Sequence, residues 1–203
     1  MRFRAVAMIG LGILLGACST VEKLNPFAAD PPKVKPAELV PLTNSVELRP
    51  AWQVAVGAAG EYVFTPAVVG TTVFAAARDG SVLRADQGAQ AWRTGLGQVI
   101  SGGVGADAKR VVVGSPKGEI IAMDATNGRE IWRVRVSSEV LAAPVVSDDV
   151  VLVRSADSRI FAFDAVDGKR RWVYQRTLPA LSLRSPTGLV VAGKVVLAGF
   201  PGG

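Results

Sequence analysis

The sequence predicts an all-β fold built from repeated units, and two observations support this prediction. The four tryptophans, Trp52, Trp92, Trp132 and Trp172, follow one another at a constant spacing of 40 residues. A period of this length is typical of stacked or radial repeat architectures. Residues 51–203 also lack a sustained apolar period of 3.6 residues with helix caps, and show short β-branched runs between turn residues instead.

Each unit is predicted to hold four short strands. In the third unit we expect strands at 143–146, 150–154, 159–163 and 170–175, separated by turns rich in Asp, Ser and Gly. The corresponding strands are expected at 66–69, 72–76, 82–85 and 91–94 in the first unit, and at 103–104, 110–113, 119–123 and 130–134 in the second. Four antiparallel strands in about 40 residues are the layout of a propeller blade, so the sequence predicts a β-propeller.

Both ends of the repeat region are predicted to hold incomplete units. Residues 51–56, with Trp52, form an expected fourth strand without the three that would precede it. Residues 189–191 and 194–198 begin a fourth unit. We therefore expect about three full blades plus partial ones, and interpret the chain as the N-terminal part of a propeller that aggregates or folds only partly by itself.

Further positions recur with the tryptophans, namely Gly88, Gly128 and Gly168 four residues before them, and Asp124 and Asp164 eight residues before them. Asp86 takes the corresponding place in the first unit if the turn after it is two residues shorter than in the other units. Residues that recur in every unit are expected to be scaffold, because an Asp before a tight turn caps its own backbone and Trp packs in or between blades. The alternative is that these carboxylates are catalytic groups or calcium ligands.

The segment from Ala122 to Trp132, with Asp124 and Gly128, resembles the PQQ-type (quinoprotein) propeller repeat. The resemblance implies eight blades in a complete ring, an Asp and a Gly that shape the last hairpin, and a Trp that docks one blade on the next. The first unit departs from this pattern at Arg84, where the repeat has Ala. The Gly-His and Trp-Asp signatures of WD40 repeats are absent, and the sequence contains no histidine at all.

The N-terminal part of the sequence is predicted to be an export signal and a tether. Residues 1–17 have Arg2 and Arg4 before an apolar run too short to span a bilayer, which is typical of a signal peptide. The run ends in Leu-Gly-Ala before Cys18 and resembles a lipoprotein lipobox, which implies lipidation of Cys18. Residues 18–50 hold six of the twelve prolines and are expected to be an extended tether, leaving 51–203 as the propeller part.

The composition excludes several kinds of active site. Without histidine there is no His-based triad or His metal site, and with one cysteine there is no intrachain disulfide or CxxC centre. The glycine-rich residues 95–103 lack the third glycine of a dinucleotide fingerprint and are expected to be a loop between blades. Lys169, Arg170 and Arg171 are expected on the solvated side of an outer strand. We expect no catalytic residue, metal or cofactor.

The chain as a whole resembles the BamB family of lipoproteins from the outer-membrane β-barrel assembly machinery. The resemblance covers the lipobox, the proline-rich tether, the repeats and the run Leu181-Ser182-Leu183-Arg184. It implies a non-enzymatic scaffold, anchored at the periplasmic face of the outer membrane, whose Leu181, Leu183 and Arg184 bind the POTRA domains of BamA. Ser185 departs from the Gly that is common in the family after this Arg. The alternative function is a PQQ-dependent, dehydrogenase-like or ligand-binding periplasmic propeller.

Overall fold

The computed structural model describes residues 38, 46, 48–177 and 186–200. The chain divides into two units, Met1–Leu48 and Arg49–Gly203, and all assigned strands lie in the second. The predicted signal peptide, Cys18 and most of the tether lie outside the described residues.

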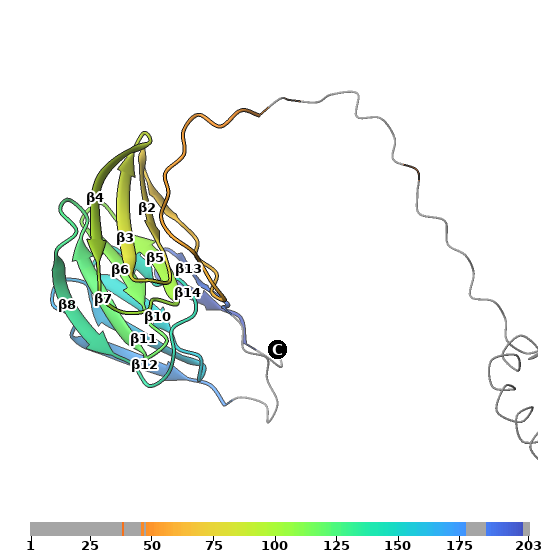
Figure 1. Ribbon diagram of the computed structural model, residues 1–203. Coiled ribbons are helices and arrows are strands. Elements are labelled where there is room, and N and C mark those ends of the chain that lie inside the picture. Colours follow the sequence, from red (N-terminus) through yellow and green to blue (C-terminus); the bar gives the residue numbers. More distant parts are fainter. Residues whose placement is uncertain (1–37, 39–45, 47, 178–185, 201–203) are drawn as a thin grey trace, which may run out of the picture. The chain divides into compact units, whose positions relative to one another are not determined.

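Three four-stranded antiparallel sheets and one two-stranded sheet make up the second unit (Figure 1). Sheet 1 contains β1 (Ala67–Val69), β2 (Thr72–Ala76), β3 (Ser81–Asp86) and β4 (Ala89–Gly95). Sheet 2 contains β5 (Gly102–Ala106), β6 (Arg110–Gly114), β7 (Glu119–Asp124) and β8 (Glu130–Arg135). Sheet 3 contains β9 (Val145–Ser147), β10 (Val150–Arg154), β11 (Arg159–Asp164) and β12 (Arg170–Gln175). Sheet 4 contains β13 (Leu189–Ala192) and β14 (Val195–Ala198).

The all-β prediction is confirmed for the part of the chain that the structure describes. β2, β10 and β12 have the predicted bounds, and the other strands differ from the prediction by one or two residues at one or both ends. Strands of one sheet follow each other in chain order, as in propeller blades. The ring of eight blades stays a prediction. No described segment forms a helix that is long and apolar enough to cross a membrane.

The strand predicted at 51–56 is wrong, since the structure assigns none before β1. A strand requires a neighbour with which to pair, and the described residues offer this segment none. Its carbonyl groups are bound by a side chain instead, because the Arg93 guanidinium donates hydrogen bonds to the oxygens of Ala55 and Val56. The segment therefore lies beside β4 without joining a sheet.

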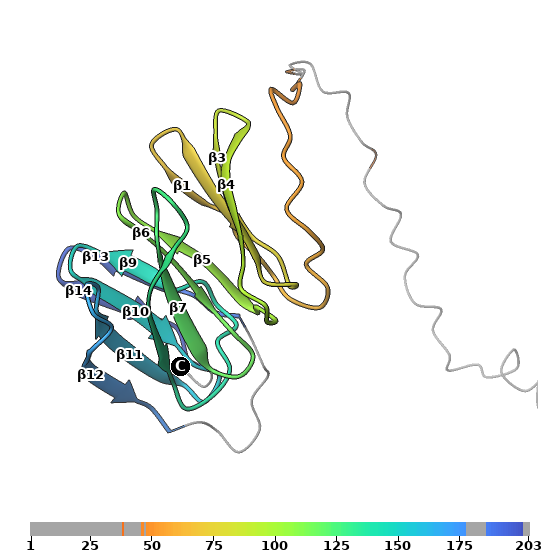
Figure 2. The ribbon, with the colours of Figure 1, turned by 60° about the vertical axis from the view of Figure 1, so that its left-hand side comes forward.

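The core lies between successive sheets, which follow one another in chain order (Figure 2). β6 and β7 are buried on both faces because sheet 1 covers one face and sheet 3 the other. Val111 and Val113 thus pack toward sheet 1, and Val112 packs toward sheet 3. Strands covered on both sides are continuous apolar runs, which explains why Val-Val-Val in β6 shows no polar alternation.

Glycine allows β5 to approach the residues just before β9 closely. A Cβ added to Gly102 would lie 2.6 Å from the Ala142 oxygen, and one added to Gly105 would lie 2.1 Å from the Pro144 oxygen. The glycine-rich residues expected to be a loop thus end within β5. A larger side chain in either place would push the two sheets apart.

Candidate protein-binding surface

Two aspartates of the repeat hold their own turns. Oδ1 of Asp124 accepts the backbone N–H groups of Thr126 at 2.7 Å and Asn127 at 3.2 Å, and also the Thr126 hydroxyl. Oδ1 of Asp164 accepts the N–H of Val166 at 2.8 Å. Hydrogen bonds from the side chain and backbone of Thr126 lower the pKa of Asp124, so this carboxylate is ionised at neutral pH.

Asp86 differs from the other two aspartates. It accepts the Thr72 hydroxyl at 2.6 Å and the Arg84 Nε–H at 3.1 Å, and these two partners lower its pKa. The expectation that Asp86 caps its own turn is therefore wrong. Its turn, Gln87-Gly88, is shorter than those of the other sheets, and the carboxylate binds side chains of β2 and β3 instead.

The described part of the chain shows no candidate metal site. It contains no group of three or more His, Cys, Asp or Glu side chains able to hold a metal ion. Its buried polar side chains are serines, and Ser101 Oγ donates to the Val140 oxygen at 2.7 Å while Ser115 Oγ accepts the Glu119 N–H at 2.9 Å. The hydroxyls of Ser101 and Ser115 thus bind backbone groups, whereas the Ser155 hydroxyl donates to Oδ1 of Asp157.

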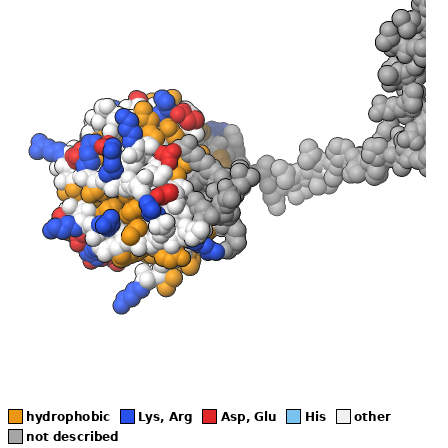
Figure 3. All heavy atoms as spheres, turned by 90° about the horizontal axis from the view of Figure 1, so that it is seen from below, with side chains coloured by type: hydrophobic (Ala, Val, Ile, Leu, Met, Phe, Trp, Pro, Cys, Tyr) orange, Lys and Arg blue, Asp and Glu red, His pale blue; other side chains and the backbone are white. Residues whose placement is uncertain are grey.

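The basic run at the start of β12 is largely paired with acids. Lys169 Nζ lies 2.7 Å from Asp167, and Arg171 Nη2 lies 2.7 Å from Asp149 and 2.8 Å from Asp164. The Arg171 guanidinium, through hydrogen bonding, lowers the pKa of Asp149. On the face shown in Figure 3, basic and acidic side chains likewise lie among hydrophobic ones.

The residues predicted to bind a partner, Leu181, Leu183 and Arg184, lie outside the described residues, as does Cys18. The described chain ends on one side of them at Thr177, just after β12, and resumes at Pro186. Pro186 lines a hollow of about 210 Å³ together with Tyr62, Val63 and Leu141, among others. β12 itself is exposed along its whole length.

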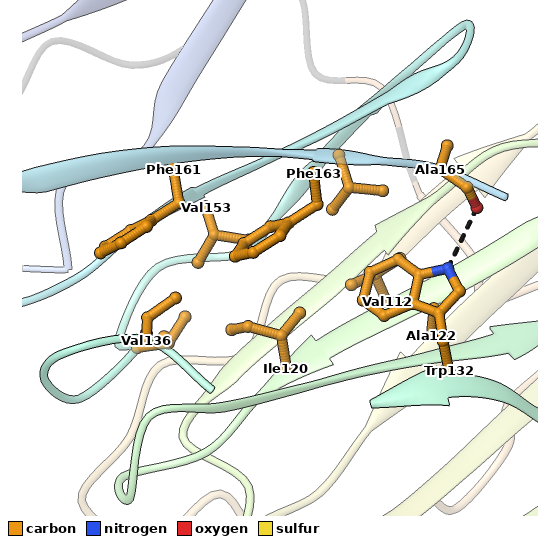
Figure 4. Packing of buried hydrophobic residues seen from close by; sticks show 11 residues of the cluster. Val112, Ile120, Ala122, Trp132, Val136, Val153, Phe161, Phe163 and Ala165 are labelled. Atoms are coloured by element: carbon orange, nitrogen blue, oxygen red, sulfur yellow. Dashed lines mark hydrogen bonds between the residues drawn. The ribbon is translucent and has the colours of Figure 1, made fainter. Parts of the chain in front are cut away.

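Tryptophans join one sheet to the next through two contacts. The Nε1–H of Trp92 donates to the Ala125 oxygen at 3.0 Å, and that of Trp132 donates to the Ala165 oxygen at 3.1 Å. The second bond and the apolar side chains around it are seen in Figure 4. Each acceptor lies in the turn after the third strand of the following sheet, so the indole links consecutive sheets.

A glycine of that same turn lies against the face of each indole. A Cβ on Gly128 would lie 2.7 Å from Cε3 of Trp92, and one on Gly168 would lie 2.8 Å from Cδ2 of Trp132. Gly88 is related to Trp52 in the same way, with 2.7 Å to its Cβ. Glycine is required here because it tolerates both the left-handed backbone and the ring contact.

Among the described residues, Trp172 has neither the indole hydrogen bond nor the glycine contact that Trp92 and Trp132 have. This difference is not evident from the sequence. Trp172 is 42% exposed, compared with 7% for Trp132. Its ring lines a groove of about 610 Å³, with side chains from β11, β12, β14 and the residues that follow β12 and β14. The groove-lining residues are Ile160, Trp172, Val173, Tyr174, Arg176, Val196, Ala198 and Phe200.

The family model of outer membrane protein assembly factor BamB matches residues 78–203. The assembly factor BamB of Bordetella pertussis is 41% identical to this chain over 201 residues, and that of Burkholderia pseudomallei is 34% identical. Each of these alignments covers 98% of this chain and 50% of the relative. The chain thus spans about half the length of the curated relatives it matches.

A solved structure agrees with the sequence relatives. The crystal structure of BamB from Moraxella catarrhalis superposes with a TM-score of 0.61 at 29% identity, covering 68% of this chain and 46% of that one. The chain belongs to the family of outer membrane protein assembly factor BamB.

Proposed function

We propose that this chain is part of a non-enzymatic scaffold that assists the assembly and insertion of β-barrel proteins in the outer membrane. The main observation in support is the 41% identity to a BamB assembly factor over 98% of the chain. The structure contributes a series of packed sheets in which Asp124 and Asp164 hold turns. Such a body suits binding of other proteins, since its exposed strands and loops remain available.

Attachment to the membrane is the first part of this proposal. Cleavage before Cys18 and acylation at that residue would anchor the chain at the periplasmic face of the outer membrane. Two acyl chains suffice for stable anchoring, because each buried CH₂ contributes about 0.8 kcal/mol. A proline-rich tether to residue 50 would reach up to about 100 Å at roughly 3.1 Å per residue.

The second part is a binding site for the POTRA domains of BamA at Leu181, Leu183 and Arg184. In an extended segment, residues two apart project to the same side, so both leucines would be presented together, with the arginine as a charged anchor. The segment joins sheet 3 to sheet 4, where the flanking strand β12 is exposed. Partner-binding residues are commonly found on segments that connect the strands of a sheet scaffold.

Copurification tests the binding site. The chain is coexpressed with BamA, and recovery is compared between the unaltered chain and a triple variant with Leu181→Ala, Leu183→Ala and Arg184→Ala. We expect recovery to fall at least tenfold in the variant, and not in a Val166→Ala control, because Val166 is exposed in another turn. Undiminished recovery of the triple variant would reject the site assignment.

The absence of an enzymatic function is tested separately. A quinoprotein-like site would bind PQQ with calcium, and binding to the folded state alone raises the melting temperature. We expect the melting temperature to stay unchanged when PQQ and calcium are added together. A rise that increases with ligand concentration would favour the ligand-binding alternative.

A further inference from the structure

We propose that the hollow of about 210 Å³ beside Pro186 receives an apolar side chain from a POTRA domain of BamA. We call it the anchor hollow, and its lining residues are Glu61, Tyr62, Val63, Ser101, Leu141 and Pro186. The inference rests on the proposed binding of BamA. It adds to that binding a second contact, made by residues that lie in other sheets than the predicted run of leucines and arginine.

The anchor hollow is formed by the segments that lead into the first strands of all four sheets. Val63 comes before β1, and Ser101 directly precedes β5. Leu141 comes before β9, and Pro186 comes before β13. The first strands of successive sheets lie next to one another, so the residues that lead into them meet at one place. A side chain bound there would contact all four segments at once.

Hydrogen bonds hold the walls of the anchor hollow in place. The N–H of Thr65 donates to the Gly103 oxygen at 3.1 Å, which fixes the segment before β1 against β5. The Ser101 hydroxyl donates to the oxygen of Val140, the residue before Leu141, at 2.7 Å. A site whose walls are already ordered loses less conformational entropy when a partner binds.

The lining of the anchor hollow is largely apolar and accessible from outside. Val63 is 64% exposed and Pro186 is also exposed, while Tyr62 and Leu141 are partly buried. A single exposed apolar side chain is ordinary on a protein surface. Several of them around one hollow are typical of the centre of a protein interface, where an anchoring side chain is inserted.

The size and charge of the anchor hollow favour one apolar side chain as its occupant. An apolar cavity of about 150 Å³ takes up a benzene molecule, so the larger volume here accommodates a leucine or phenylalanine side chain. The one carboxylate of the lining, Glu61, is already paired, because Arg78 Nε lies 3.0 Å from it. A cationic side chain is therefore not required, and the ion pair supplies the polar rim of an interface.

The place of Pro186 in the sequence connects the anchor hollow with the proposed BamA site. Pro186 follows Arg184 by two residues, and two residues extend over at most about 7 Å. A stable interface buries about 800 Å² of each partner, which corresponds to a patch about 16 Å in radius. A partner bound around Arg184 therefore reaches Pro186 and the hollow that it lines.

Photocrosslinking within the complex tests this contact directly. Val63 is replaced by the photoreactive residue benzoylphenylalanine in the full chain, which is coexpressed with BamA. The matched control carries the same residue in place of Val68, which is 68% exposed in β1 but does not line the hollow. We expect an adduct between the chain and BamA, formed at least tenfold more from position 63 than from position 68.

A substitution measures how much the contact contributes to binding. Val63→Asp places a carboxylate in an apolar hollow beside Glu61, so we expect recovery of BamA to fall at least tenfold. Val63→Ile and Val68→Asp should leave the recovery unchanged. Val63→Asp is expected to fold because the side chain is mostly exposed, and an unchanged circular dichroism spectrum verifies this.

Equal adduct yields from the two positions, or undiminished recovery of Val63→Asp, would overturn the inference. If the triple variant at Leu181, Leu183 and Arg184 then still loses BamA, the proposed function stands without the anchor hollow. An unaltered chain that recovers no BamA would reject the proposed function and this inference together. An adduct between two copies of this chain from position 63 would assign the hollow to a second copy and would also overturn the inference.

Discussion

At the scale of single residues, the joints between sheets depend on glycine at one position of each turn. Gly128 has a φ of 71°, a left-handed conformation that side chains other than glycine rarely adopt. Its place is also too tight for a side chain, because a Cβ would lie 2.5 Å from the Thr94 hydroxyl oxygen and 2.7 Å from Trp92. The recurrence of Gly with the tryptophan period thus has a direct steric cause.

Gly128→Ala is expected to lower the free energy of unfolding by about 2 kcal/mol, since both backbone strain and a ring clash are introduced. Urea unfolding measures the loss. The matched control is Gly95→Ala, where a Cβ would meet nothing within 4 Å and no left-handed φ is required. Equal stability of the two variants would contradict the steric explanation.

Acid is expected to destabilise the fold through the turn carboxylates. The Thr126 hydrogen bonds lower the folded-state pKa of Asp124 below its unfolded value of about 3.9. A carboxyl group whose pKa is lowered by folding stabilises the folded state at pH values above its unfolded-state pKa. This stabilisation is lost as the pH falls through the folded-state pKa. The melting temperature should therefore decline below about pH 5, and less steeply in Asp124→Asn. An identical decline in both proteins would contradict this assignment.

At the scale of elements, a β-bulge precedes the tryptophan in the fourth strand of each four-stranded sheet. The register of β7 and β8 shifts between Ala122 and Met123, so that Ile131 has no partner and Trp132 pairs with Ala122. The same shift occurs in sheets 1 and 3. Bulges bend a strand and re-aim its side chains, and here the tryptophan after the bulge reaches the next sheet.

Two equivalent tryptophans should differ in their contribution to stability. Trp132→Phe leaves the buried Ala165 carbonyl without its donor and opens a gap in the core, so we expect a loss of about 2–3 kcal/mol. Trp172→Phe should cost less than about 1 kcal/mol, because its ring is half-exposed. Urea titration of both variants compares them, and equal losses would show that Trp172 is already covered.

At the scale of the whole molecule, sheet 4 has apolar residues on both faces and cannot bury them alone. Val190, Val195 and Leu197 are each more than half exposed on this two-stranded sheet. Leu152 of β10, which has the same register position as Leu197, is buried against sheet 4. Exposed edges with apolar side chains favour association between chains.

The chain is therefore expected to self-associate with increasing concentration, and a Val190→Glu, Leu197→Glu double variant should do so less. Light scattering across a dilution series measures both. The charges fall on exposed positions, so the folded core should be retained, with an unchanged circular dichroism spectrum as the control. An unaltered chain that stays monodisperse and melts cooperatively would contradict the interpretation as an incomplete propeller.

The sequence by itself determined the repeat, the strands within it and the turns between them. These features are local, since they follow from β-branched runs, from Asp and Gly at turns, and from the 40-residue period of tryptophan. The tertiary structure decided that residues 51–56 form no strand, that Asp86 binds side chains, and that Trp172 lines an open groove. The physical reason is the same in each case, because strand pairing and burial depend on neighbours far away in the sequence. Segments with the same local sequence pattern therefore take different structures where those neighbours differ.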